Sequence, residues 1–223
     1  MTQNNSNRRG ELCSHASAHN APLQIIGLTG NSGSGKSAIA AICAEFGAYV
    51  INADDINHSN MLQGGSAYNE VCEAFGAGIL DNHGEIDRRK LGEIVFSDEK
   101  KLQTLVAITH KHVIEQTHTL IAAVQADPNG YSFILIDAPL LIEADMHKDC
   151  DEVWLAAASD EVRLARIRKR DNLSDEQIVK RFASATPSSE LAEYADVIIE
   201  NNFDNIDALK HSIKSILCKR GII

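Results

Sequence analysis

Residues 25–37 read Ile25-Ile26-Gly27-Leu28-Thr29-Gly30-Asn31-Ser32-Gly33-Ser34-Gly35-Lys36-Ser37, and this stretch decides the fold. An apolar run leads into Gly30, and four residues separate Gly30 from the triplet Gly35-Lys36-Ser37. This spacing is typical of a phosphate-binding loop between a strand and a helix. A Gly-rich surface turn is the alternative. A buried strand predicted at residues 23–29 and a helix predicted at residues 38–46 favour the phosphate-binding loop.

The residue types of this loop fit the chemistry of a nucleotide phosphate. Glycines turn tightly and leave space for the ligand, so that successive backbone amides form an anion nest. A helix beginning near Lys36 adds its partial positive charge. Lys36 can reach the β- and γ-phosphates, and the hydroxyl of Ser37 can bind Mg²⁺. The candidate nucleotide-binding residues are Asn31, Ser32, Gly33, Ser34, Gly35, Lys36, Ser37 and Ala38.

Composition limits the class of protein. A chain of 223 residues suffices for one α/β domain with an inserted subdomain. The net charge of −10 argues against nucleic-acid and anionic-membrane partners, which need a basic field. Five scattered cysteines without a C-x-x-C pair are typical of reduced thiols, so we expect a cytoplasmic protein. The sequence has no apolar run close to the roughly 20 residues of a membrane helix, and polar residues 1–21 are expected to form a disordered tail.

The hydrophobic pattern predicts an α/β fold. Apolar runs at residues 48–51, 131–137, 151–158 and 196–200 join the strand at 23–29, which predicts a five-stranded parallel sheet flanked by helices. Residues 138–143 are expected to form a tight turn into a short helix. The predicted P-loop kinase core comprises residues 22–55 and 127–223, and its lid lies at about 159–186.

Residues 56–126 are mostly helical and lack a convincing core strand. Such a long helical segment between two strands predicts an insertion that binds the acceptor. Its long last helix, capped by residues 97–98, has an expected buried stripe of Leu102, Leu105, Val106, Val113, Leu120 and Val124. The basic residues Arg88, Arg89 and Lys90 could meet an anionic acceptor, and a solvated helix start is the equal alternative.

Acidic side chains follow two of the predicted strands. Ligands of open parallel sheets bind beyond the carboxyl ends of the strands, where Asn52, Asp54 and Asp55 follow one strand and Asp137 ends another. The acidic cluster at residues 52–55, which includes Asp54, is a candidate site for the magnesium ion or the acceptor hydroxyl, and a helix N-cap is the alternative. Both can hold for different residues. On an extended segment Asn52 and Asp54 would point the same way. Asp137 resembles a carboxylate that orients magnesium.

A helix predicted at residues 159–171 carries a row of cations. Arg163, Arg166 and Arg170 are spaced i, i+3 and i+7 and therefore share one face. Phosphoryl transfer needs cations near the γ-phosphate, and a mobile arginine lid supplies them. A solvated charged helix is the alternative.

From about residue 23 to 217 the chain resembles the dephospho-coenzyme A kinase family. The matching stretches are 28–37, 50–54, 75–76, 79–80, 88–96, 137–143, 166, 170–171 and 196–202. The most specific of these are the Ala53-Asp54 pair, the P-L-L-x-E turn at 139–143 and the E-N-N turn at 200–202. The resemblance implies a P-loop kinase that uses ATP and Mg²⁺ to phosphorylate the ribose 3′-hydroxyl of dephospho-CoA, giving CoA and ADP, the last step of CoA synthesis.

The resemblance also implies roles for single residues. Asp54 matches the proposed base, and Lys36, Arg166 and Arg170 match cations of the transfer site. Arg88, His110 and Leu140 match acceptor positions, Asn201 and Asn202 a turn near the adenine, and Ser37 and Asp137 the metal site. The chain departs from the family pattern at Asn52, His58, Lys111 and Ala185.

Three other functions remain open. One is another P-loop small-molecule or nucleoside monophosphate kinase, and another is a non-catalytic nucleotide-binding relative. The third, a GTP-dependent switch, usually carries an N-K-x-D turn, which this sequence lacks. The expected partner is a small-molecule substrate, and we expect a monomer.

Overall fold

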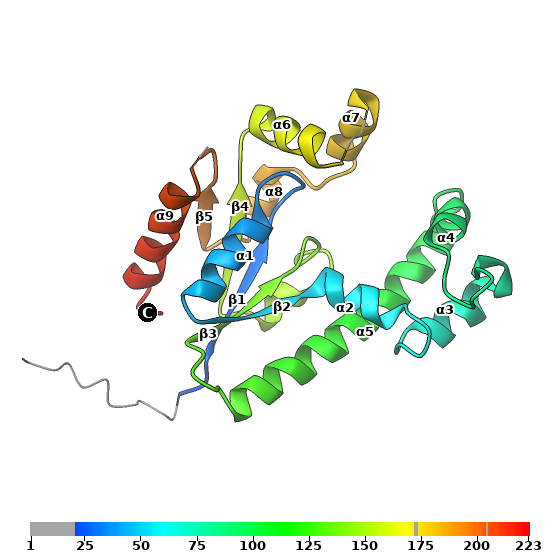
Figure 1. Ribbon diagram of the computed structural model, residues 1–223, viewed down its shortest axis with the longest axis horizontal. Coiled ribbons are helices and arrows are strands. Elements are labelled where there is room, and N and C mark those ends of the chain that lie inside the picture. The colour runs from blue at the N-terminus through cyan, green and yellow to red at the C-terminus, as the bar shows by residue number, and fades with distance from the viewer. Residues whose placement is uncertain (1–20, 172–173, 204) are drawn as a thin grey trace, which may run out of the picture.

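Five parallel strands form the centre of the computed structural model, which describes residues 21–171, 174–203 and 205–223 (Figure 1). They are β1 (Gln24–Thr29), β2 (Ala48–Asn52), β3 (Phe133–Asp137), β4 (Glu152–Ala157) and β5 (Val197–Glu200). Their order is β2-β3-β1-β4-β5, and every neighbouring pair is parallel. The five predicted strands are therefore confirmed. The predicted tail lies, except for residue 21, outside the described residues.

Helices cover both faces of this sheet, and strand β3 therefore buries side chains on both sides. Phe133 and Leu135 face a cluster with α1 (Lys36–Glu45) and α9 (Ile206–Lys219). Ile134 and Ile136 face the other cluster, to which the second half of α5 (Glu99–Ala126) contributes. Alternate side chains of a strand point to opposite faces, so a strand that is covered on both sides reads as a continuous apolar run.

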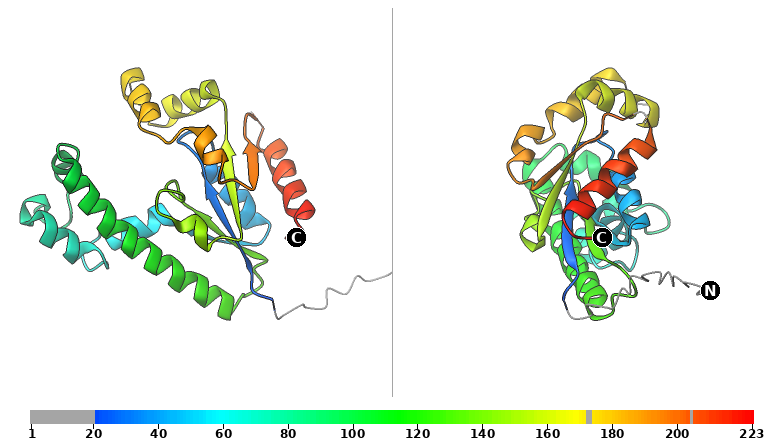
Figure 2. Two further views of the ribbon diagram at one scale, coloured as in Figure 1. Left: turned by 180° about the vertical axis from the view of Figure 1, so that it is seen from behind. Right: turned by 90° about the vertical axis from the view of Figure 1, so that its left-hand side faces the viewer.

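The segment between β2 and β3 consists of helices that extend away from the sheet (Figure 2). They are α2 (Ala53–Asn60), α3 (Tyr68–Phe75), the 3₁₀ helix η1 (Ala77–Ile79), α4 (Arg88–Val95) and α5. Ala67, Val71, Ile79, Leu91, Val95 and Ile108 form a separate buried cluster there. From Val113 onward α5 packs on the sheet instead, so one helix joins both clusters. The boundaries of the predicted acceptor-binding insertion, residues 56 and 126, stay a prediction.

The expected buried stripe of α5 is only partly correct. Val113 and Val124 are buried, but Leu102, Leu105 and Leu120 are half-buried and Val106 is 37% exposed. The first half of α5 has a small cluster beside it and an open cavity at Val106, so it has fewer neighbours to cover its apolar face.

The remaining helices belong to the predicted lid region and the turn after β3. The lid comprises α6 (Asp160–Asp171) and α7 (Asp175–Ala183), and α7 begins with a capping box of Ser174 and Gln177. The short helix α8 (Ser188–Ala192) follows. The expected turn into a short helix after β3 is confirmed, but the helix begins later than expected: residues 139–145 form turns and lead into the 3₁₀ helix η2 (Met146–Asp149). Asp145 has φ 59°, which takes the chain out of a right-handed helical path. In the described part of the chain, no helix combines the length and apolarity of a membrane span.

Candidate active site

The predicted phosphate-binding loop joins β1 to α1, and α1 begins at Lys36 with Gly35 as its N-cap. Gly35 has φ 93°, and a Cβ at this position would collide with the side-chain amide of Asn201. Gly33 has φ 84°, and a Cβ there would lie 2.8 Å from the carbonyl oxygen of Arg163. Positive φ and close packing together explain why glycine occupies both positions.

The turn after β5, which contains Asn201 and Asn202, packs against the phosphate-binding loop. The buried side chain of Asn201 donates from Nδ2 to the carbonyl oxygen of Ser34 at 2.9 Å. Arg166 donates to Gly33 O at 3.3 Å and to Asn201 Oδ1 at 3.5 Å. Asn202 Oδ1 accepts from the backbone N–H of Ser159, at the start of the lid, at 2.8 Å. Both asparagines thus bind protein groups, and their place near an adenine stays a prediction.

A polar cavity of about 500 Å³ lies over the loop. Its lining comprises Gly30, Asn31, Ser32, Gly33, Gly35, Lys36, Ser37, Asp54, Pro139, Arg166 and Arg170. The structure therefore brings most of the predicted nucleotide-binding and catalytic residues together. Successive loop amides, a helix N-terminus and three cationic side chains make this cavity suited to a polyphosphate.

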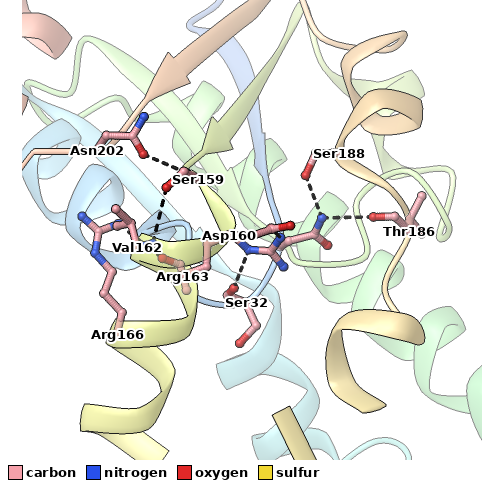
Figure 3. Close-up of polar contacts among 11 residues, drawn as sticks. Ser32, Ser159, Asp160, Val162, Arg163, Arg166, Thr186, Ser188 and Asn202 are labelled. Carbon is pink, nitrogen blue, oxygen red and sulfur yellow. Dashed lines mark hydrogen bonds and ion pairs between the residues drawn. The ribbon is translucent and has the colours of Figure 1, made fainter. Parts of the chain in front are cut away.

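The three arginines of α6, in the predicted lid, make hydrogen bonds to the loop, but their surroundings differ. Figure 3 shows Arg163 and Arg166. Arg166 and Arg170 line the polar cavity. Arg163 is buried: it donates to Ser32 O at 3.1 Å and to Asp160 at 2.7 Å, and its guanidinium lies 4.2 Å from the ring centre of Phe182. Arg163 is thus buried between the loop and Phe182, whereas Arg166 and Arg170 contact the loop and also line the cavity.

Asp137 and Lys36 form the buried charged pair of the site. Asp137 Oδ1 lies 3.8 Å from Lys36 Nζ and has no hydrogen-bond partner in the described part of the chain. Burial raises the pKa of Asp137, and the nearby Lys36 opposes that rise, whereas Asp54 adds to it. An unpartnered carboxylate oxygen beside a phosphate loop fits a divalent cation. The described residues contain no cluster of three or more His, Cys, Asp or Glu that could hold a metal ion.

The end of β2 resolves the alternatives for Asn52 and Asp54. Asn52 is the N-cap of α2, and its Oδ1 accepts from the backbone N–H groups of Asp54 at 2.9 Å and Asp55 at 3.1 Å. The expectation that Asn52 and Asp54 point the same way on an extended segment is wrong, because α2 already begins at Ala53. Asn52 caps the helix, and the exposed side chain of Asp54 lies in its first turn at the polar cavity.

A second, largely apolar cavity of about 240 Å³ adjoins the first. Asp54 and Pro139 line both cavities, and the predicted acceptor residues His110 and Leu140 line the second. The sequence reasoning missed the other walls, which are Ala53, Asn57, Met61, Leu105, Val106, Thr109, Val113, Ala138, Ala144 and Met146. These walls come from α2, from α5 and from the turn after β3, so local sequence signals did not connect them.

Arg88 lies apart from the other predicted acceptor residues. It contacts Nδ1 of His58 and lines a third cavity of about 150 Å³ with His58, Leu62, Glu85 and Ile86. Met61 lines both this cavity and the apolar one, so the two adjoin.

Comparisons with known proteins agree with this geometry. The profile of the dephospho-CoA kinase family matches residues 24–207. The chain is 38% identical to the dephospho-CoA kinase of Carboxydothermus hydrogenoformans over 88% of this chain and 94% of that one. It is 40% identical to the enzyme of Aquifex aeolicus over 81% and 89%. A crystal structure of a Thermus thermophilus protein, 28% identical, superposes with a TM-score of 0.74 over 89% of this chain and 98% of that one. The phosphate loop at the end of β1 and the helical segment before β3 agree with this match, which covers most of the chain. The chain therefore belongs to the dephospho-CoA kinase family of P-loop kinases.

Proposed function

We propose that the protein transfers the γ-phosphoryl group of ATP, bound with Mg²⁺, to the ribose 3′-hydroxyl of dephospho-CoA, giving CoA and ADP. The observation that carries this proposal is the junction at Asp54, which lines both the polar cavity over the phosphate loop and the apolar cavity beside it. A carboxylate at this junction can meet the hydroxyl of an acceptor on one side and a phosphate on the other.

The residues of the polar cavity supply the nucleotide half of the reaction. Loop amides and Lys36 would hold the β- and γ-phosphates, and Ser37, together with Asp137 beside Lys36, would hold the magnesium ion. When bound, the ion neutralises charge on the phosphate oxygens. Arg166 and Arg170 line the cavity from the lid and stabilise the charge that shifts during transfer. Asp54 orients the attacking hydroxyl and accepts its proton.

The apolar cavity receives the acceptor. Its walls suit the alkyl and amide arm of dephospho-CoA, and His110 and Leu140 line it together with Asp54. Burial lowers the pKa of His110, and the neutral ring can donate or accept one hydrogen bond. Arg88 in the adjoining cavity can pair with an anionic group of the acceptor.

Three of the four positions that depart from the family pattern have partners in this structure. Asn52 caps α2, His58 contacts Arg88, and Lys111 forms an ion pair with Glu70 at 3.3 Å. Each of these contacts supports the fold beside the proposed acceptor site, which accords with a working enzyme.

The direct test measures ADP release by the purified protein with ATP and Mg²⁺, with and without dephospho-CoA. AMP and shikimate serve as alternative acceptors, and mass spectrometry identifies the product. We expect ADP release that depends on dephospho-CoA, with CoA as product. ADP release without any acceptor, or preference for another acceptor, would contradict the proposal.

Two neighbouring carboxylates provide a matched pair of variants. Asp54→Asn should lower kcat by at least about a hundredfold, the lower end of general-base contributions, with ATP affinity changed by no more than a few-fold. Asp55→Asn makes the same chemical change on an exposed residue outside the lining of both cavities and should keep kcat close to that of the parent enzyme. Equal kcat values for the two variants would remove Asp54 from the mechanism.

A further inference from the structure

The phosphate-binding loop is attached to both ends of the lid. At the first end, Arg163 donates to the carbonyl oxygen of Ser32. At the second end, the side-chain amide of Asn31 donates to Thr186 O at 3.0 Å and to Ser188 Oγ at 3.1 Å, between α7 and α8 (Figure 3). Two adjacent loop residues are therefore held by two segments that lie more than twenty residues apart in the chain.

A side-chain hydrogen bond continues from the second attachment toward the acceptor side. The hydroxyl of Thr186 donates to Glu143 Oε1 at 2.6 Å. Hydrogen bonds to a carboxylate are shorter and stronger than those between neutral groups. Glu143 ends the P-L-L-x-E turn after β3, and Leu140 of this turn lines the apolar cavity.

Glu143 lies in the turn that forms one wall of the apolar cavity, between the lining residues Leu140 and Ala144, and the backbone N–H of Ala144 donates to Leu140 O at 2.9 Å. The carboxylate of Glu143 also raises the pKa of His110, against the larger lowering by burial. The same turn is fixed to the sheet, because Thr29 Oγ1 donates to Pro139 O at 3.2 Å. The turn that lines the apolar cavity is thus joined to the loop through the hydrogen bonds of Glu143 with Thr186 and of Thr186 with Asn31.

We propose that Thr186 is a positioning residue, which couples an acceptor in the apolar cavity to the phosphate-binding loop through its hydrogen bond to Glu143 and the contact of its carbonyl with Asn31. This inference rests on the proposed function for the identity of the acceptor. An acceptor that contacts Leu140 and His110 fixes the turn after β3. The turn holds Thr186 through Glu143, and Thr186 holds Asn31 and with it the loop. Coupling between two binding sites is reciprocal, so each substrate tightens the binding of the other.

The test compares variants at one hydroxyl. Thr186→Val removes the hydrogen-bond donor at nearly constant volume, and Thr186→Ser restores it. Thr119→Val is the matched control, because Thr119 is exposed on α5 and its hydroxyl, among the residues that the structure describes, bonds only within its own helix, to Glu115 O. Glu143→Gln probes the same hydrogen bond from the other partner, since it keeps an acceptor oxygen but removes the charge.

The main readout is the affinity for a non-hydrolysable ATP analogue, measured by calorimetry with and without saturating dephospho-CoA. In the parent enzyme we expect saturating dephospho-CoA to lower the dissociation constant of the ATP analogue by about fivefold or more, the lower end of allosteric coupling. In Thr186→Val this ratio should fall to within about twofold of one, while the affinity for either substrate alone stays within about threefold. Loss of one hydrogen bond to a charged group should lower kcat by about tenfold. Thr186→Ser should recover both values, and Glu143→Gln should give intermediate ones.

The outcomes separate this inference from the proposed function. A parent enzyme that makes CoA but shows no coupling, or a Thr186→Val variant that keeps the parental ratio, overturns the coupling alone. Equal effects of Thr186→Val and Thr119→Val on kcat overturn it as well, because they would reflect general destabilisation. A parent protein that makes no CoA overturns the proposed function and this inference together.

Discussion

Replacing Asn52 by alanine tests whether the cap of α2 holds the proposed base in place. Asn52 Oδ1 accepts from the backbone N–H groups of Asp54 at 2.9 Å and Asp55 at 3.1 Å. Alanine leaves both donors without this partner, which costs about 1 kcal/mol of folding free energy. For a chain of this size, that loss lowers the melting temperature by about 2–4 °C.

The same substitution should affect catalysis, because Asp54 is itself one of the two capped residues. Without the cap, the first turn of α2 frays more easily, and the side chain of Asp54 is no longer held where the two cavities meet. If the whole of about 1 kcal/mol is lost from the transition state, kcat falls about fivefold. Asn52→Asp keeps the acceptor oxygen and adds a negative charge at a helix N-terminus, so it should retain stability and activity.

Asp98→Ala provides the matched control. Asp98 caps α5 in the same manner, accepting from Lys100 N at 3.0 Å and Lys101 N at 3.3 Å, and it is outside the lining of both cavities. Scanning calorimetry should find a similar loss of stability in both alanine variants. Steady-state kinetics at saturating substrates should find a lower kcat only for Asn52→Ala. An equal fall in kcat for both, or a destabilised Asn52→Ala enzyme with unchanged kcat, would refute the reasoning.

Three further substitutions test the polar cavity. Lys36→Ala removes the ammonium group beside Asp137 and should lower kcat by two to three decades, about 3–4 kcal/mol, and near-normal turnover would contradict the role of the loop. Arg170→Ala should lower kcat and kcat/KM alike, because the lid arginine acts mainly on the transition state, and a change in KM for ATP alone would make it a ground-state binder. Asp137→Asn should raise the melting temperature of the ligand-free protein at neutral pH while abolishing activity. The folded state raises the pKa of Asp137, so its ionisation costs stability as pH rises through the unfolded pKa, and asparagine avoids this cost. In thermal unfolding the gain should therefore vanish as the pH is lowered to about 4, and a gain that is independent of pH would contradict it.

The sequence determined the features that depend on near neighbours along the chain. The spacing of Gly30, Gly35 and Lys36 predicted the loop and the first residue of α1, because backbone turning and helix initiation are local. The apolar run that contains Phe133 to Ile136 predicted β3, because a strand covered on both faces needs apolar side chains at every position. Residues 97–98 predicted the start of α5, where Asp98 is the N-cap, since an N-cap bonds to amides two or three residues away.

Tertiary structure decided which of the predicted groups meet. Spacing alone placed Arg163, Arg166 and Arg170 on one face of α6, but burial under Phe182 removes Arg163 from the cavity that the other two line. The sequence allowed Asn52 to face the site or cap a helix, and the point where β2 ends made it the cap.

The apolar cavity and the contact between Glu143 and Thr186 had no local signal at all. The cavity needs walls from α2, α5 and the turn after β3, and the hydrogen bond joins residues 43 positions apart. Val106 looked like a core residue by its helical spacing, but the small cluster beside the first half of α5 leaves it at the cavity. Helical and strand periodicity report which face of an element is apolar. Only the packing of the whole chain decides whether that face meets another element or remains open to a ligand.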